Sequence, residues 1–408
     1  MQAELVLTGA ELLLGINADT HTPFLADGLA RVGATLARVT MVGDARDEIA
    51  AAVREALVRA DAVIVTGGLG PTHDDLTAAA LADACGVPVA EHPEALRLIE
   101  ETMRARGRAL DAIQRRQAQL PQGAVPIPNP TGIAPGIHLH AGDREVFCLP
   151  GVPGELRPMA EAYVFPHLAQ LLRGVRVPLR RTLRLAGVPE SQVIKSLGDR
   201  IERYQPAITI LAKLGEVHLV VTAGEVAALD AFEREVVAAF PDRLFGRDGE
   251  SLEEVIGKAL TARKQTLALA ESCTGGLLAH RITNVPGSSA YLLAGVVSYS
   301  NESKSALLGV PDDLLRAHGA VSAPVAEAMA AGARRVANAT VAVSTTGIAG
   351  PTGGTPEKPV GLVYIGLADE RHAQSHEYRF VRDREANKAL AAQMALLHLW
   401  LWLRGTAA

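Results

Sequence analysis

The chain has 408 residues, of which 48% are hydrophobic and 21% charged, and its formal net charge is −5. This length predicts two or three domains of roughly 150 residues each. The composition is that of a globular protein, and no segment approaches the roughly 18 uncharged apolar residues of a membrane helix, so no membrane association is expected. The negative charge gives no electrostatic footprint for nucleic acid, and direct nucleic-acid binding is not expected.

Cysteine usage and the first residues suggest a compartment. Cys85, Cys148 and Cys273 are far apart and form no CxxC pair, which argues against a disulfide framework and against a structural zinc site. No basic region precedes the first apolar run, which Glu4 interrupts, so no secretory signal is expected. The predicted location is the cytoplasm.

The first part of the chain alternates short apolar runs with stretches of helical periodicity. Its order is ELVLTG, PFLADGLARVG, ATLARVTMVGD, DEIAAAVREALVRA and DAVIVTGG. In the fourth stretch Ile49, Val53 and Leu57 recur every four residues and share one helix face. The resulting β-α-β-α-β order predicts an α/β domain with a parallel sheet covered on both sides.

A glycine-rich loop follows the last of these strands. In VIVTGGLGPTHDD, residues 63 to 75, the glycines expose backbone N–H groups suited to phosphate, and Asp74 and Asp75 could hold a divalent cation. The loop has neither the Walker A nor the GxGxxG pattern. The alternative is that Asp74 or Asp75 only caps the next helix, which ends at Gly86.

The pattern changes after about residue 170. TLRLAG, PESQVIKSLGDRIERY, AITILAKLGEVHLVVTAG and ALDAFEREVVAAF predict a strand, a helix, a hairpin around Leu214 and Gly215, and a second helix. This small α+β module ends at a polar stretch, residues 246 to 254, that reads as a linker. A third, α/β segment follows, and its apolar end LLHLWLWL is expected in the core because it is too short to span a membrane.

Polar residues follow or end three predicted strands of the third segment: Ser272, Tyr299 and Thr346. The carboxyl ends of parallel strands line a common crevice, so these side chains are expected to converge. Lys304 lies about one turn into a helix that Ser300 or Asn301 could cap, and can face the same crevice.

These residue types suit amide hydrolysis. A serine hydroxyl needs a base, and a lysine can serve if burial keeps it neutral near pH 7. Tyr299 could relay a proton, and the N–H groups of Gly275 and Gly276 suit an oxyanion. Cys273 is the rival nucleophile, but neighbouring residues at a strand end point in opposite directions, so only one of the two can face the crevice.

Simpler interpretations remain open at this stage. Ser272 and Thr274 could be N-caps, Lys304 a solvated surface residue, and Tyr299 a packing residue. The stretch GIAGPTGGTPEKPVG, residues 347 to 361, is either a turn-rich connection or a loop over a ligand.

Seven motifs occur in order across residues 270 to 385: AESCTGG, VPGSS, VVSYSNESK, HGAVS, TTGIAGPTGG, EKPVG and RDRE. Together they resemble the C-terminal domain of the competence- and damage-inducible protein CinA family, whose members include nicotinamide mononucleotide deamidases. The resemblance implies hydrolysis of the carboxamide of nicotinamide mononucleotide to nicotinic acid mononucleotide and ammonia, a step of NAD recycling, without a metal or other cofactor.

The same resemblance implies residue roles. Ser272 would be the nucleophile, Lys304 its base and Tyr299 an assistant. It adds Glu271 and Thr346 as catalytic candidates, and Thr274, Gly275, Gly276, Gly347 and Arg384 as substrate-binding candidates. Arg384 would clamp a phosphate because a guanidinium fork matches phosphate geometry, and a surface salt bridge is the alternative.

Six further motifs occur in order across residues 8 to 155: TGAELLLG, GINADT, GGLGPTHDD, QRRQA, NPTGIAPG and LPGVPGE. They resemble the CinA N-terminal domain, which is related to molybdopterin-binding domains and is associated with metal-dependent ADP-ribose pyrophosphatase activity. The resemblance implies a divalent metal ion, of an identity left open, and potassium as a further candidate cofactor. The implied metal ligands are Glu11, Asp44, Asp74, Asp75 and Glu155, and the implied binding residues are Gly67, Gly68, Gly70 and Thr72. Ala10 and Gln114 depart from the family pattern, which has threonine and asparagine there.

The predicted architecture is therefore a doubly wound molybdopterin-binding-like domain over residues 1–170, a KH-like α+β domain over 171–247 and an α/β deamidase domain over 248–408. The middle domain has no clear GxxG loop and is expected to be a spacer or dimerisation element. The expected partners are small nucleotides and a second copy in a homodimer. The competing hypothesis is a non-catalytic nucleotide-binding or adaptor protein of the competence or DNA-damage response.

Overall fold

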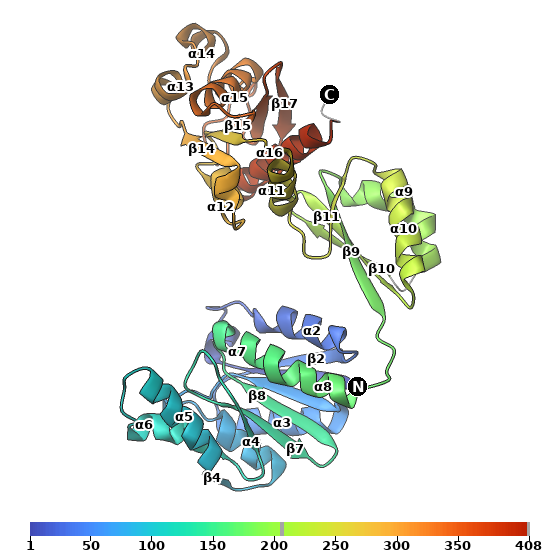
Figure 1. The fold of residues 1–408 in the computed structure, drawn as a ribbon, viewed down its shortest axis with the longest axis vertical. Helices are drawn as coiled ribbons and strands as arrows, with labels where there is room; N and C mark the ends of the chain where they lie inside the picture. Colours follow the sequence, from blue (N-terminus) through green and yellow to red (C-terminus); the bar gives the residue numbers. More distant parts are fainter. Residues whose placement is uncertain (205–207, 406–408) are drawn as a thin grey trace. The chain divides into compact units, whose positions relative to one another are not determined.

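The computed structural model describes residues 1–204 and 208–405, which divide into two units, Met1–Pro178 and Leu179–Ala408 (Figure 1). Ala207, the first residue of the predicted strand AITILAK, lies outside the described residues. Within the described residues, no helix combines the length and the apolar character that crossing a bilayer requires.

A six-stranded sheet forms the centre of the first unit, in the order β2-β1-β3-β8-β7-β6. The first four strands in this order are mutually parallel, β7 is antiparallel to its neighbour β8, and β6 is antiparallel to β7. The predicted parallel sheet is therefore confirmed for the β-α-β-α-β segment, whereas the hairpin between β7 and β8 makes the whole sheet mixed. The strands are β1 (Gln2–Thr8), β2 (Thr35–Val42), β3 (Ala62–Thr66), β6 (Val125–Ile127), β7 (Gly136–Ala141) and β8 (Arg144–Leu149), with β4 (Val89–Glu91) and β5 (Gln119–Pro121) paired separately.

Helices cover both faces of this sheet, as expected of a doubly wound domain (Figure 1). On one face Leu25 and Leu168 pack against the sheet residues Ile64 and Phe147. On the other face the predicted helix stripe of Ile49 and Val53 is buried. The helices are α1 (Ala10–Leu13), α2 (His21–Arg31), α3 (Arg46–Arg59), α4 (Thr77–Cys85), α5 (Pro93–Ala105), α6 (Ala112–Arg115), η1 (Arg116–Ala118), α7 (Pro153–Met159), η2 (Ala160–Val164) and α8 (Phe165–Leu171).

The second unit begins with an antiparallel four-stranded sheet in the order β10-β11-β9-β12. The hairpin predicted around Leu214 and Gly215 joins β10 to β11, where Lys213 pairs with Glu216. Helices α9 and α10 pack on this sheet through a core that includes Val193 and Phe232. The elements are β9 (Leu179–Ala186), α9 (Glu190–Tyr204), β10 (Ile208–Lys213), β11 (Glu216–Ala223), α10 (Val226–Ala239) and β12 (Leu244–Arg247).

A five-stranded sheet, β14-β13-β15-β16-β17, completes the second unit. Strands β14, β13 and β15 are parallel, so their carboxyl ends meet at one edge of the sheet. Strand β16 is antiparallel to β15, and β17 is antiparallel to β16. The elements are α11 (Leu252–Arg263), β13 (Leu267–Glu271), α12 (Leu277–Thr283), η3 (Ser288–Ala290), β14 (Leu292–Val297), α13 (Asn301–Leu308), α14 (Asp312–His318), α15 (Ala323–Ala337), β15 (Val341–Gly347), β16 (Leu362–Ala368), β17 (Ala373–Arg379) and α16 (Arg384–Arg404).

Helix α16 packs on one face of this sheet with α11 and α12. Its apolar end from Leu396 to Leu401 is buried, as the sequence predicted. Helix α15 covers the other face with α13 and α14, through Met329 and Leu308.

Candidate functional site

Ser272 lies directly after β13, at the edge where the parallel strands end. Its side chain is buried, and its backbone N–H donates to the carbonyl of Thr345 on the neighbouring β15 at 2.9 Å. Gly275 and Gly276 then adopt the left-handed region with φ of 62° and 95°, which turns the chain into α12. The N-cap of α12 is Gly276, so Ser272 and Thr274 are not the caps that the simpler interpretation supposed.

Lys304 reaches Ser272 from α13. Ser300 caps this helix, because its hydroxyl accepts from the N–H of Ser303 at 3.1 Å. The Lys304 side chain is only 1% exposed, which excludes a solvated surface role. Its Nζ donates to Ser272 Oγ at 3.1 Å and to the carbonyl oxygens of Ser298 and Tyr299 at 2.9 and 3.3 Å.

Burial gives Lys304 the character of a base. It lowers the pKa of the Lys304 ammonium because the charged form loses hydration, although Cys273 acts in the opposite direction. Over residues 1–204 and 208–405, no carboxylate forms an ion pair with Lys304 that would stabilise its charge. A neutral amine can keep two N–H bonds to the two carbonyls and direct its lone pair at the Ser272 hydroxyl. The pair can therefore generate an alkoxide-like nucleophile.

The neighbouring Cys273 faces the core instead. It is 6% exposed and packs with Leu269 and Leu278. Burial raises the pKa of the Cys273 thiol to about 12, so the thiol stays protonated at neutral pH. As expected for adjacent residues, one side chain faces Lys304 and the other is buried among apolar groups.

Glu271 has a positioning role. Its fully buried carboxylate accepts three backbone N–H bonds at the start of α12, from Gly276 at 2.9 Å, Leu278 at 3.0 Å and Ala279 at 2.8 Å. Negative charge at a helix N-terminus is stabilised by the helix dipole. The carboxylate thus fixes the turn that carries Ser272, and its two oxygens are already engaged by these three N–H groups.

The same bonds correct the prediction for the two glycines as oxyanion donors. The Gly276 N–H is bonded to Glu271, and the Gly275 N–H donates to the carbonyl of Ser272 at 3.1 Å. In the part of the chain that the structure describes, no other residue accepts from the N–H groups of Cys273 and Thr274. These two groups, directly after the nucleophile candidate, are the donors available to an oxyanion.

Three other predicted residues make contacts inside the protein beside this site. The hydroxyl of Thr274 shares a 2.7 Å hydrogen bond with that of Thr345, and both threonines are fully buried. The hydroxyl of Thr346 donates to the carbonyl of Ala320 at 2.7 Å, so it is not directed at Ser272. Gly347 ends β15, where an added Cβ would lie 2.7 Å from the carbonyl oxygen of Leu362.

Tyr299 and Arg384 form an exposed pair beside the serine and lysine. The Tyr299 side chain is 61% exposed, and its hydroxyl accepts from Arg384 Nη2 at 3.2 Å. The other guanidinium nitrogen, Nη1, donates to the carbonyl of Gly350 at 2.6 Å. Tyr299 therefore contacts Lys304 through its carbonyl, whereas its ring hydroxyl is paired with Arg384 and not with Ser272.

The predicted N-terminal residues line one cavity of about 560 Å³ in the first unit. It lies at the carboxyl ends of β1, β3 and β8, where the rules for α/β sheets place a ligand. The predicted residues on its wall are Glu11, Asp44, Gly67, Gly68, Gly70, Asp74, Asp75, Glu155 and the departing residue Gln114. Thr72 is not on the wall, but its N–H and hydroxyl hold Asp75 Oδ2 at 2.8 and 2.6 Å.

Two of the loop glycines leave room for polar side chains. An added Cβ at Gly68 would lie 2.1 Å from Thr77 Oγ1, and one at Gly70 would lie 2.5 Å from Asp75 Oδ2. The N–H of Gly67 was predicted to be available to a phosphate. It donates instead to the carbonyl of Leu149 at 2.9 Å. Within the described ranges, the N–H groups of Gly68 and Gly70 have no acceptor.

The carboxylates of this cavity do not form an all-protein cation cage. Asp44 accepts from the N–H of Ala10 at 3.0 Å, and Glu155 accepts from Asn129 at 2.7 Å. Among the described residues, no three of the cavity's carboxylates bring ligand oxygens within 4.8 Å of one another. The set fits a cation held by one or two carboxylates together with ligand phosphates and water, as is usual for Mg²⁺.

Several residues of the two sites were not predicted from the sequence. Arg106, on the cavity wall, donates to the carbonyl of Thr131 at 2.6 Å and brings a positive charge to an otherwise acidic wall. Gln117, also on the wall, keeps a buried Oε1 without a partner. Ser298 has a buried hydroxyl without a partner beside Lys304. Gln117 and Ser298 stand within the QRRQA and VVSYSNESK motifs, whereas no quoted motif contains Arg106.

Known proteins are similar to this chain over nearly its whole length. Family models described as "Probable molybdopterin binding domain", "Damage-inducible protein CinA KH domain" and "CinA C-terminal domain" match residues 4–170, 180–246 and 249–402. A competence-damage inducible protein of Symbiobacterium thermophilum is 47% identical over 379 residues, covering 90% of this chain and 88% of that protein. A CinA-like protein of Anaeromyxobacter sp. strain Fw109-5 is 44% identical over 411 residues, covering 99% and 100%. A crystal structure of the protein CinA from Thermoplasma acidophilum is 33% identical and covers 41% of this chain and 99% of that chain, with a TM-score of 0.39.

Proposed function

The chain belongs to the CinA family, and on that premise we propose that its second unit hydrolyses the carboxamide of nicotinamide mononucleotide to nicotinic acid mononucleotide and ammonia. The observation that carries the proposal is the 3.1 Å contact between Lys304 Nζ and Ser272 Oγ in a buried setting. A protein that only binds nucleotides has no use for a serine held against a desolvated lysine.

The proposed reaction proceeds through an acyl-enzyme. Neutral Lys304 takes the proton of Ser272 as Oγ attacks the carboxamide carbon, and the N–H groups of Cys273 and Thr274 stabilise the oxyanion. Lys304 then donates that proton to the leaving nitrogen, which departs as ammonia when the C–N bond breaks. Water attacks the resulting ester, Lys304 accepts its proton and returns it to Ser272, and the carboxylate product leaves.

Arg384 is the candidate for the substrate phosphate. Its guanidinium donates to the carbonyl of Gly350 and to the hydroxyl of Tyr299, the residue whose carbonyl Lys304 contacts. A planar guanidinium binds phosphate with two parallel N–H bonds. Tyr299 is then a positioning residue for Arg384.

The test is ammonia release from nicotinamide mononucleotide by the purified full chain, with and without EDTA. Because neither Ser272 nor Lys304 uses a metal in the proposed steps, release should persist in EDTA. Absence of ammonia release by correctly folded protein would overturn the proposal and favour a nucleotide-binding or adaptor role, which predicts thermal stabilisation by the nucleotide without a product.

The first unit supports a second candidate function, metal-dependent hydrolysis of ADP-ribose. The observation that favours it is the cavity that combines carboxylates, the unbonded N–H groups of Gly68 and Gly70, and Arg106. A bound divalent cation would neutralise the pyrophosphate and polarise its phosphoryl oxygens. Hydrolysis of ADP-ribose should stop in EDTA and in Asp75→Asn, while ammonia release should continue in both.

A further inference from the structure

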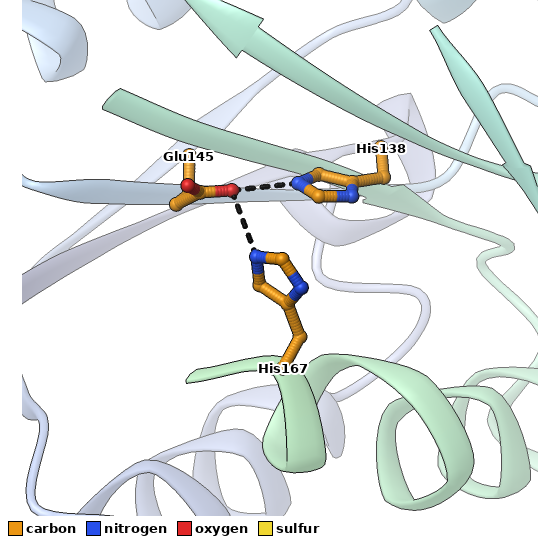
Figure 2. A group of neighbouring side chains, drawn as sticks. All are labelled: His138, Glu145 and His167. Atoms are coloured by element: carbon orange, nitrogen blue, oxygen red, sulfur yellow. Dashed lines mark hydrogen bonds and ion pairs between the residues drawn. The ribbon is translucent and has the colours of Figure 1, made fainter. Parts of the chain in front are cut away.

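A separate group of ligating side chains lies at the hairpin between β7 and β8 in the first unit (Figure 2). Its members are His138 on β7, Glu145 on β8 and His167 on α8, and His140, also on β7, contacts Glu145 as well. Glu145 lies near the start of β8, whereas the nucleotide cavity begins at Pro150 beyond the end of that strand. Five residues of extended chain, about 16 Å, separate the two places.

The local sequence explains why these side chains meet. In GIHLHAGDRE the two histidines alternate along β7 and so face the same side of the sheet. Gly142, with φ of 61°, turns the chain back so that Glu145 pairs directly with His140. Helix α8 covers this face of the sheet and directs His167 toward Glu145 (Figure 2).

Three imidazoles converge on one buried carboxylate. Glu145 Oε2 lies 2.6 Å from His138 Nε2 and 3.2 Å from His167 Nε2, and Glu145 Oε1 lies 3.2 Å from His140 Nδ1. The donor atoms of His138, Glu145 and His167 are all within 4.8 Å of one another. His138 and Glu145 are only 2% and 7% exposed, so their polar atoms depend on one another and not on water for hydrogen bonds.

The orientation of His138 is that of a metal ligand. Its Nδ1 lies 3.0 Å from the hydroxyl of Tyr163, which leaves Nε2 directed at the carboxylate. Metal-bound histidines usually bond through one nitrogen and engage an oxygen group through the other. Over the described part of the chain, Glu145 has no lysine or arginine partner. One protonated histidine would balance its charge, so the other two imidazoles are surplus to an ion pair.

We propose that His138, Glu145 and His167 bind a divalent cation of the zinc class, with His140 or water as the fourth ligand. Two imidazoles and one carboxylate with an open fourth position is a common zinc ligand set. Imidazole-rich sets favour zinc, copper or nickel, whereas Mg²⁺ prefers oxygen ligands. The site uses no cysteine, which is why the cysteine spacing did not predict it. The bound ion would fasten α8 to the hairpin.

The test titrates Zn²⁺ alone into the metal-stripped full chain by calorimetry. His167→Gln should weaken the Zn²⁺ affinity by more than about 100-fold, because loss of a mere supporting residue already costs about 10- to 100-fold. The matched control is His372→Gln, which removes an exposed histidine of the second unit and should bind Zn²⁺ as the unaltered chain does. The His167 side chain is 28% exposed, so glutamine is expected to be accommodated.

Co²⁺ substitution gives a second measurement that does not depend on a variant folding. Four-coordinate ligation at this site predicts strong visible absorption by bound Co²⁺, which a six-coordinate oxygen site in the cavity that contains Asp75 would not give, and Asp75→Asn should leave this spectrum unchanged. Zn²⁺ should also raise the melting temperature of the unaltered chain but not of His167→Gln. Zn²⁺ binding that is absent, or equally tight in His167→Gln, would overturn the proposal, as would the weak visible absorption of a six-coordinate Co²⁺ ion alone.

Discussion

Lys304 Nζ lies 3.1 Å from Ser272 Oγ, although the two residues are 32 positions apart and belong to different elements. The contact exists because α13 begins where β14 ends, next to the end of β13 in the parallel part of the sheet. The lysine is buried with carbonyl oxygens as its other partners, so its charge is not offset by a carboxylate.

Replacing Ser272 with alanine should lower ammonia release by several orders of magnitude, since the oxygen that attacks the carboxamide is gone. The fold should persist, because among residues 1–204 and 208–405 the removed hydroxyl is bonded only to Lys304. Steady-state rates and a thermal melt check both statements. The matched control is Ser305→Ala. Ser305 is on the same helix as Lys304, its hydroxyl donates to Asp312 of α14, and the variant should keep its turnover. Full activity of the Ser272 variant would exclude the serine mechanism.

The activity should depend on pH through Lys304. Burial lowers its pKa, so kcat/KM should rise as the pH increases through that lowered pKa and reach a plateau below the ordinary lysine value of about 10.5. In Lys304→Gln this rise and nearly all turnover should be lost, whereas Lys258→Gln, at an exposed lysine, should keep both. A rise that survives in Lys304→Gln would assign the base to another group.

The same lowered pKa has a consequence for stability. Between the folded and unfolded pKa values the unfolded chain binds more protons, so the free energy of unfolding should increase with pH in that window. Lys304→Gln should flatten this increase, which urea unfolding at a series of pH values would measure.

Glu271→Gln should destabilise the second unit. An amide in place of the carboxylate loses the charge that three N–H bonds at the start of α12 require, and bonds to charged groups contribute about 1.5–3 kcal/mol each. We expect a loss of about 2–4 kcal/mol in the free energy of unfolding, together with lower turnover because Ser272 is less well positioned. Urea unfolding against the exposed control Glu370→Gln tests this. Unchanged stability would contradict the positioning role.

Cys273→Ala should keep the catalytic activity. The thiol is packed in the core and its raised pKa of about 12 keeps it protonated, so its loss removes packing but no chemistry. Ammonia release by this variant, and by the unaltered chain after treatment with iodoacetamide, is the measurement. Abolished turnover in a folded Cys273 variant would favour a thiol mechanism instead.

Arg384→Lys should raise KM for nicotinamide mononucleotide by about tenfold with a smaller change in kcat. A lysine keeps the positive charge but not the two-pronged geometry that matches phosphate. Arg379→Lys, at an exposed arginine paired with Glu377, is the control. The phosphate role would be wrong if nicotinamide riboside, which lacks the phosphate, showed the same increase in KM.

Periodicity and turn residues alone predicted most of the elements. The hairpin around Leu214 and Gly215 matches its prediction, because Gly215 adopts the positive φ of 75° at the turn between two apolar runs. The edge strand β17 was not predicted, since AQSHEYR has only polar and half-buried positions and its neighbour β16 decides its conformation. The motifs named Ser272, Lys304 and Arg384 as a set without placing them.

The tertiary structure decided what each of these residues can do. Packing between segments far apart in sequence decides three properties of the site. It decides that Ser272 and not Cys273 faces Lys304, that the Lys304 side chain is buried, and that the Glu271 carboxylate accepts three N–H bonds. The same holds for the imidazole cluster, where α8 supplies His167 to a hairpin 22 residues earlier in the chain. Local sequence sets backbone preference and the face that a side chain occupies, but burial and hydrogen-bond partners, which control pKa and ligand geometry, arise only when distant elements meet.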